Sequence, residues 1–247
     1  MDVLLWLGVF VLLAYTVEAM TGFGSIVIAL SLGALLMPVA ELVPILVPLN
    51  VLMTSWLCWR LRRHLDLALL RTRILPWMLA GTVVGYLMLP LLREDWLKPL
   101  FGTLVVWFAA REWWRLRGGS LQGASGRRVR PFIFAAGISH GLFASGGPLL
   151  VYALAGTTLD KARLRATLIC VWLVLNSALT LAFLVDGRLA VALPSVLWLA
   201  PLLPLGVWLG EHLHQRVDEL RFRQLIYVLL LIVGALLVLN SVRITLT

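Results

Sequence analysis

Apolar segments long enough to cross a membrane follow one another along almost the whole chain. Short polar or charged stretches separate eight such segments, which cover residues 3–37, 39–59, 67–92, 96–114, 131–156, 164–185, 189–213 and 222–242. A transmembrane helix needs about 20 apolar residues, and backbone groups in hydrocarbon must find their hydrogen bonds within the segment, which favours helices. The pattern predicts an all-α integral membrane protein.

Composition excludes two other classes of protein. The 247 residues are 61% hydrophobic and 13% charged, whereas soluble domains carry about 25% charged residues. A net charge of +9 could indicate nucleic-acid binding, but the basic residues form short clusters between the apolar segments, as cytoplasmic loops do. We therefore expect a multi-pass protein of the bacterial inner (plasma) membrane that contacts the lipid bilayer and no nucleic acid.

The two halves of the chain share a pattern of residues in the same order. The stretch GFGSIVIAL, which starts at Gly22, lies 122 residues before ASGGPLLVY, which starts at Ala144. Further correspondences in that order are Glu18 with His140, Thr54 with Asn176, and Gly81 and Gly85 with Gly206 and Gly210 after a three-residue insertion. We predict two homologous transmembrane repeats, 1–114 and 131–247. The Gly- and Ser-rich stretch between them, 115–130, has the composition of a flexible linker and is expected on the cytoplasmic side.

Each half begins with a glycine-broken segment and continues with three predicted transmembrane helices. If the broken segments re-enter on the side from which they start, each half crosses the membrane three times and the halves are inverted. If they cross, the halves are parallel. The inverted layout places far more of the 21 Lys and Arg residues on one side, as the positive-inside rule expects. Residues 3–20 alone could span the membrane, so both layouts stay open at this point.

The broken segments are the main pointer to function. Gly22 and Gly24 interrupt the first segment, and Gly146, Gly147 and Pro148 interrupt the fifth. Glycine costs about 1 kcal/mol in a helix interior and proline about 3, so we expect an unwound link at 144–147, a new helix from Pro148, and a counterpart at 21–25. A helix that starts inside a membrane presents unpaired N–H groups and a positive dipole end, which suit an anion. Close helix packing or a simple kink is the alternative interpretation.

Residues at and near these breaks form the predicted binding site. The candidate substrate-binding residues are Thr21, Gly22, Phe23, Gly24, Ser25, Asn50, Thr54, Ser145, Gly146, Gly147 and Asn176. Glu18 and His140 are the candidate ion-coupling residues, because ionisable groups inside a membrane are expensive and often functional. For these polar side chains the competing interpretation is a hydrogen bond between helices.

No pattern in the sequence indicates catalysis. No HExxH, P-loop or paired-carboxylate pattern stands out in the sequence, so we expect no enzyme, no cofactor and no metal site. Two other functions stay open: a thiol-redox membrane protein using Cys58 and Cys170, and a non-catalytic accessory membrane subunit. The first is weakened because Cys58 corresponds to Thr180 in the repeat, so the two cysteines do not match each other.

The chain resembles the TauE/SafE sulfite and organosulfonate exporter family. The resemblance rests on GISHGLFASGGPLLVYAL and DKARLRATLICVWLVLNSAL in the second half, and on GFGS and RRHLDLAL in the first. It implies a secondary transporter that exports a small sulfur-containing anion, coupled to a proton or sodium gradient. The sequence departs from the family pattern in lacking a proline after the first break and in placing Pro44 and Pro48 in the second segment. The oligomeric state is not predicted.

Overall fold

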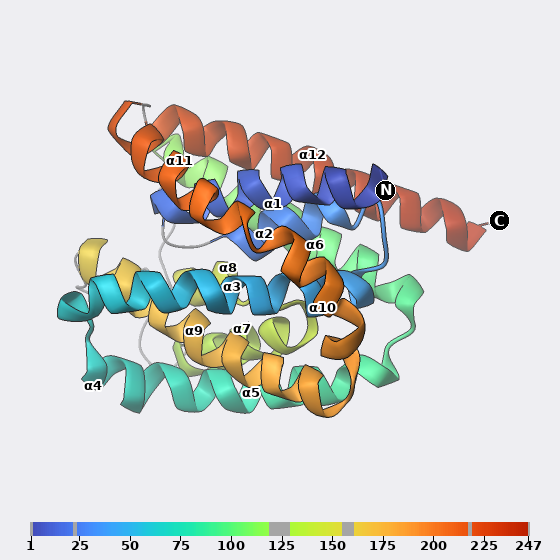
Figure 1. Cartoon of the computed structure of the whole chain (residues 1–247). Coiled ribbons are helices and arrows are strands. Elements are labelled where there is room, and N and C mark those ends of the chain that lie inside the picture. The colour runs from blue at the N-terminus through green and yellow to red at the C-terminus, as the bar shows by residue number, and fades with distance from the viewer. Residues whose placement is uncertain (1, 22–23, 119–128, 155–160, 217–218, 247) are drawn as a thin grey trace.

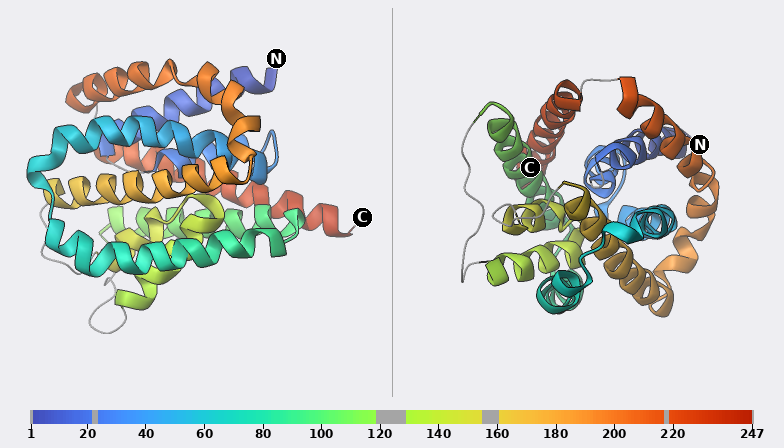
Figure 2. Two further views of the ribbon diagram at one scale, coloured as in Figure 1. Left: turned by 60° about the horizontal axis from the view of Figure 1, so that its bottom comes forward. Right: turned by 90° about the vertical axis from the view of Figure 1, so that its left-hand side faces the viewer.

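The computed structural model of the chain describes residues 2–21, 24–118, 129–154, 161–216 and 219–246. Every regular element in these ranges is a helix, and the long helices run roughly along one common direction (Figures 1 and 2). Of the helices in these ranges, five are long and apolar enough to span a membrane, and a sixth span is formed if α10 and α11, which meet at a 51° bend, are taken together. The chain is therefore a multi-pass membrane protein.

The helices follow the predicted apolar segments. Their bounds are α1 Asp2–Thr21, α2 Ser25–Gly33, α3 Val39–Leu61, η1 Arg62–His64, α4 Leu67–Leu69, η2 Leu70–Ile74, α5 Leu75–Met88, η3 Leu89–Leu91, α6 Glu94–Leu116, α7 Val129–Phe143, α8 Gly147–Leu154, α9 Lys161–Val185, α10 Arg188–Leu199, α11 Leu202–Arg216 and α12 Glu219–Leu246. The fourth predicted segment forms the helix α6. Because α6 carries several charged residues, it is not among the five helices that are long and apolar enough to span a membrane.

Close packing between helices depends on glycine. On α5, a Cβ added to Gly81 would lie 2.2 Å from the backbone oxygen of Phe134, and one added to Gly85 would lie 2.2 Å from that of Ile138. Only glycine lets α5 approach α7 this closely, as small residues do at helix contacts in lipid. The other long pairs are α1 with α11, α3 with α9, and α6 with α12.

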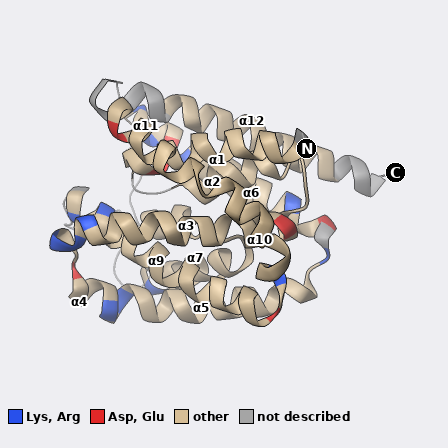
Figure 3. Cartoon of the chain, viewed as in Figure 1, with Lys and Arg blue, Asp and Glu red and all other residues tan. Residues whose placement is uncertain are grey.

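The two ends of the bundle differ in charge. Lys and Arg side chains gather where α3 passes into α4 and where α9 begins, while the opposite end carries Asp and Glu together with fewer basic residues (Figure 3). The N-terminus and the connection from α2 to α3 both lie at this second end (Figure 1). The pair α1–α2 therefore starts and finishes at the same end of the bundle.

A small polar cluster closes the turn between α9 and α10. Asp186 accepts hydrogen bonds from the Tyr86 hydroxyl and from Nε of Arg188, the latter at 2.7 Å. Partial burial by itself raises the pKa of the Asp186 carboxyl, but the hydrogen bonds from Arg188 and Tyr86 outweigh burial and hold this pKa below its usual range. The cluster ties α5 to the α9–α10 turn.

The structure describes only the two ends of the predicted linker between the repeats. α6 continues through Leu116 and α7 begins at Val129, so the ends of the predicted linker 115–130 are helical. Residues 119–128 lie outside the described residues. The division of the chain into 1–114 and 131–247 stays a prediction.

Candidate functional site

Both predicted helix breaks are present. α1 ends at Thr21 and α2 begins at Ser25 after Gly24, whose φ of +102° suits glycine. α7 ends at Phe143 and α8 begins at Gly147, one residue before the predicted start. Between them Ala144 has a φ of +51°, and among the described residues it is the one non-glycine with a positive φ. Neither break is a mild kink in a continuous helix.

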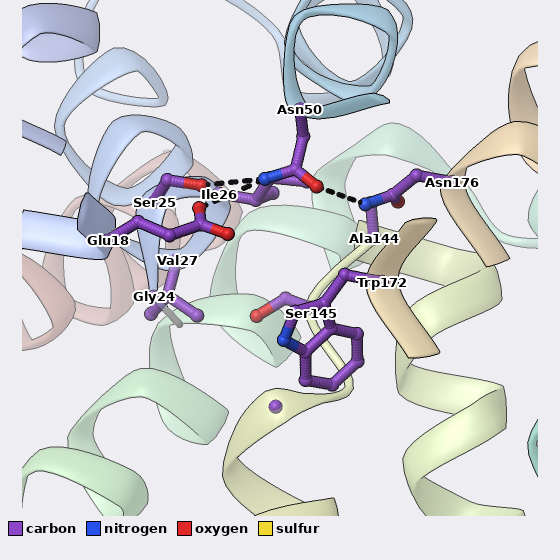
Figure 4. Close-up of a pocket in the computed structure, with 11 residues that line it drawn as sticks. Glu18, Gly24, Ser25, Ile26, Val27, Asn50, Ala144, Ser145, Trp172 and Asn176 are labelled. Atoms are coloured by element: carbon purple, nitrogen blue, oxygen red, sulfur yellow. Dashed lines mark hydrogen bonds between the residues drawn. The ribbon is translucent and has the colours of Figure 1, made fainter. Parts of the chain in front are cut away.

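The two breaks meet at one small cavity. It is lined by Glu18, Gly24, Ser25, Ile26, Val27, Asn50, Ala144, Ser145, Gly147, Trp172 and Asn176, most of which Figure 4 shows as sticks around a common space. The space open to the centres of water-sized molecules is about 20 Å³, which is enough for a water molecule. The segments that the sequence singles out, about 120 residues apart, thus form one site.

Asn50 of α3 is the centre of the hydrogen bonds in this cavity. Its Nδ2 donates to Glu18 Oε2 and to Ser25 Oγ, each at 3.0 Å, and its Oδ1 accepts from Asn176 Nδ2 at 2.7 Å. All four side chains are buried. One amide therefore connects α1, α2, α3 and α9 (Figure 4).

Several buried polar atoms of the cavity have no hydrogen-bond partner among the described residues. These atoms are Glu18 Oε1, Ser145 Oγ and Asn176 Oδ1, and Glu18 and Ser145 point toward each other across the space (Figure 4). Buried polar groups in folded proteins are almost always paired. Their presence beside a cavity indicates that water or a ligand completes their hydrogen bonds.

Two helices also begin at this cavity. Ser25, Ile26 and Val27 are the first three residues of α2, and Gly147 is the first residue of α8; all four line the space. The first N–H groups of a helix have no partner within it and carry partial positive charge. The cavity therefore combines helix N-terminal donors with a carboxyl group, Glu18, that would compete for them.

Among the predicted site residues that the structure describes, Thr21, Thr54 and Gly146 lie outside the cavity lining. The Thr21 hydroxyl donates to Val17 O at 2.9 Å and the Thr54 hydroxyl donates to Asn50 O at 2.7 Å, each within its own helix. A Cβ on Gly146 would lie 2.4 Å from Ala136 O, so this glycine serves the contact between the break and α7.

Gly22 and Phe23 were also predicted to bind substrate, and they lie outside the described residues. His140, the predicted counterpart of Glu18, is fully buried, and its ring stacks on Trp172 with centroids 5.8 Å apart. Within the described part of the chain, neither of its ring nitrogens has a hydrogen-bond partner of good geometry. His140 therefore packs behind the cavity wall, with the Asn176 side chain within reach of its ring, and its role as a second ion-coupling group stays a prediction.

Sequence reasoning missed two residues near the site. Trp172 lines the cavity one helical turn before Asn176 on α9, and a tryptophan in an apolar segment gives no signal of its own. Arg165 lies in the second turn of α9 and donates from a terminal guanidinium nitrogen to Ala19 O at 2.7 Å. It thereby satisfies a carbonyl in the last turn of α1, next to Glu18.

The two cysteines are closer than the sequence suggested. The thiols of Cys58 on α3 and Cys170 on α9 lie near enough to interact with each other, and no disulfide joins them. Neither lines the cavity. Within the described residues no cluster of His, Cys, Asp and Glu side chains could hold a metal ion.

Comparison with known families agrees with this geometry. The sequence model described as "Sulfite exporter TauE/SafE" matches residues 7–237, nearly the whole chain. No curated protein and no solved structure matches the chain. With its apolar spans and near-complete match, the chain belongs to the TauE/SafE sulfite exporter family of membrane transporters.

Proposed function

We propose that the chain is a secondary transporter that exports a small sulfur-containing anion, sulfite or an organosulfonate, across the bacterial inner membrane by alternating access. The observation that carries this proposal is the meeting of both helix breaks at one buried cavity. Helix N-termini that face each other inside a membrane protein are the recurring way to bind an anionic group near the bilayer midplane. The sulfur-containing substrate class rests on family membership.

The cavity size supports a transport cycle with more than one conformation. A volume of about 20 Å³ holds a water molecule but not a sulfite ion with its four heavy atoms. We infer that the described conformation is occluded and that the cavity widens when one side opens. Movement of α2 or α8, the two short helices at the breaks, would open it and would require their buried residues to repack.

The two halves are proposed to be inverted repeats. The return of α1–α2 to the end of the bundle at which it starts (Figure 1) supports the inversion, and the glycine contacts support the repetition. A Cβ on Gly81 would approach Phe134 O, while a Cβ on Gly206 would approach Leu12 O, which is the residue equivalent to Phe134 at the 122-residue spacing. Gly210 likewise approaches Thr16 O, just as Gly85 approaches the equivalent Ile138 O. The contact of α5 on α7 is thus repeated by α11 on α1.

The cavity itself supports the same proposal and reveals an asymmetry. At this spacing Asn50 corresponds to Trp172, so the Glu18–Asn50 hydrogen bond occupies the place of the His140–Trp172 stack. At this pair of positions the first repeat contributes a hydrogen-bonded amide and the second contributes an aromatic wall, while Ser145 and Asn176 of the second repeat also line the cavity. The basic end of the bundle in Figure 3 would face the cytoplasm under the positive-inside rule.

Glu18 is the proposed coupling residue. Its Oε1 has no partner among the described residues and its carboxyl lines the cavity. A carboxylate and an anion would repel each other strongly in this low-dielectric space. We infer that Glu18 binds a proton when the anion binds and releases it when the anion leaves, so that an outward anion gradient drives export and an inward proton gradient opposes it. Glu18→Gln should then bind and move the anion at a rate that no longer depends on pH.

Transport in proteoliposomes tests the function directly. Purified protein should move labelled sulfite or a small sulfonate down its gradient, and Ser145→Ala should weaken anion binding about tenfold through loss of a charge-assisted hydrogen bond. Ser55→Ala is the matched control, because the Ser55 hydroxyl is exposed and bonds only Val51 O in its own helix. Absence of flux and of thermal stabilisation across a panel of such anions would refute the proposal.

A thiol-redox function is the second candidate, and the contact between Cys58 and Cys170 favours it. Oxidation of the two thiols by a partner that accepts two electrons and two protons would form a disulfide that joins α3 to α9, and a reductant would reverse it. The double variant with alanine at both positions separates the two functions. Intact anion transport in that variant would exclude electron transfer through these thiols as the primary activity.

A further inference from the structure

A second and much larger cavity lies on the outer surface of the bundle, away from the helix breaks. It runs between α3 and α11 and has a volume of about 490 Å³, within the range of small-molecule binding sites. Met53 and Leu203 form its buried floor, and Trp56 and Trp208, each more than half exposed, form its sides. None of its lining residues belongs to the helix-break cavity.

The groove has a polar end and an apolar length. Leu52, Trp56 and Arg60 follow one another at four-residue intervals on one face of α3, so this wall extends about 12 Å at 1.5 Å per residue. The hydrocarbon of one bilayer leaflet is roughly half of the ~30 Å core. An acyl chain lying in the groove would therefore reach its head-group region near Arg60.

Two opposite charges stand at that end. Arg60 forms an ion pair with Glu211 of α11, and both side chains are about half exposed, at 54% and 46%. The pair lies at the basic end of the bundle, where α3 passes into η1. A head group placed there meets a guanidinium and a carboxylate together.

We propose that this groove is a binding site for a phospholipid with a phosphoethanolamine head group. One acyl chain lies between Trp56 and Trp208, the phosphate accepts hydrogen bonds from Arg60, and the ammonium donates to Glu211. A phosphoglycerol lipid satisfies Arg60 but places a neutral diol beside Glu211, and a phosphocholine lipid has no N–H to donate. The two charges thus select the head group, independently of which anion the protein carries.

Thermal unfolding of the purified full-length protein in detergent tests this assignment. Phosphatidylethanolamine, phosphatidylglycerol and phosphatidylcholine with identical acyl chains are added in separate titrations. Phosphatidylethanolamine should raise the unfolding midpoint at the lowest concentration. Glu211→Gln should weaken its binding about tenfold, through loss of one charge-assisted hydrogen bond, and abolish its advantage over phosphatidylglycerol.

A groove-filling variant gives an independent check. Val207→Trp should remove the response to all three lipids, whereas Leu225→Trp, at a 69% exposed position on α12, should leave it unchanged. If Val207→Trp does not fold, the Glu211→Gln titration decides alone. Equal responses of the wild type to the three lipids, or an unchanged preference in Glu211→Gln, would overturn the proposal. So would a dimer in solution that Val207→Trp dissociates, because a second copy would then fill the groove.

Discussion

Replacing Asn50 by leucine tests whether the hydrogen bonds of the cavity hold α1, α2, α3 and α9 together. Leucine has a similar volume, so packing is largely preserved, but three hydrogen bonds of 3.0, 3.0 and 2.7 Å disappear. Hydrogen bonds between helices in membranes contribute about 0.6 kcal/mol on average and about 1.7 at most. The expected loss of unfolding free energy is therefore about 2 kcal/mol, with an upper bound of about 5.

The assay is thermal unfolding in detergent, followed by circular dichroism. For a chain of this size, 1 kcal/mol shifts the midpoint by about 2–4 °C, so Asn50→Leu should melt about 4–8 °C below the wild type. Ser55→Ala, five residues along the same helix, removes a hydroxyl that bonds only within α3 and should melt with the wild type. A midpoint for Asn50→Leu within about 1 °C of the wild type would refute the reasoning that these bonds stabilise the site.

Three further substitutions test other parts of the structure by the same measurement. Gly85→Ala should lower the free energy of unfolding by about 1–3 kcal/mol or more, because its Cβ would lie 2.2 Å from Ile138 O. Gly206→Ala should lower it clearly less, because the nearest atom to its Cβ lies 3.3 Å away. Equal losses of stability in the two variants would contradict the close approach of α5 to α7. Ala144→Gly should leave the midpoint unchanged or raise it, since glycine relieves the positive φ of +51°; a decrease would argue against that backbone conformation. Asp186→Asn should lower the unfolding midpoint at neutral pH. The Asp186 carboxylate has a lowered pKa in the folded state, so it stabilises the fold above its unfolded-state pKa of about 3.9, and this effect is lost as pH falls through the folded-state pKa. A difference in midpoint between variant and wild type that stays constant down to pH 3 would exclude this role.

The sequence predicts the helices and both breaks because these depend on local chemistry. Apolar length sets each span, and glycine or proline marks where a membrane helix must end. Gly24 and Gly147 could therefore be assigned to breaks, and the internal repetition indicated that the breaks would meet. The start of α8 at Gly147 differs from the expected Pro148 by one residue, within the usual uncertainty of helix ends.

Side-chain direction could not be predicted from the same pattern. Asn50 and Thr54 are one helical turn apart on α3, and the sequence pattern predicts a place in the binding site for both. The structure directs Asn50 into the cavity, while Thr54 donates to its own helix. Gly146 and Gly147 are adjacent, yet one packs against Ala136 and the other lines the cavity. These differences depend on how α3 and α8 are rotated against their neighbours, which no local signal specifies.

His140 is a second case in which the sequence pattern did not predict the surroundings of a side chain. The repeat aligns His140 with Glu18, which suggested similar roles for the two ionisable groups. Because Trp172 stands where Asn50 stands in the other half, His140 stacks on an aromatic ring at the place where Glu18 bonds an amide. A correspondence in sequence position therefore indicated the place of His140 in the fold but not which side chains surround it.

Under the proposed transport cycle, the Asn176–Asn50 hydrogen bond also bears on how fast the cavity can reopen. It is a bond between two neutral amides from opposite halves of the chain, 2.7 Å long. Breaking such a bond in a membrane costs little, about 0.6 kcal/mol on average, and creates no separated charges. An aspartate–arginine pair at these two positions would be much harder to separate, because separation would leave two unpaired charges in a region of low dielectric constant. A carrier that must part and rejoin its halves in every cycle is better served by a weak, neutral latch.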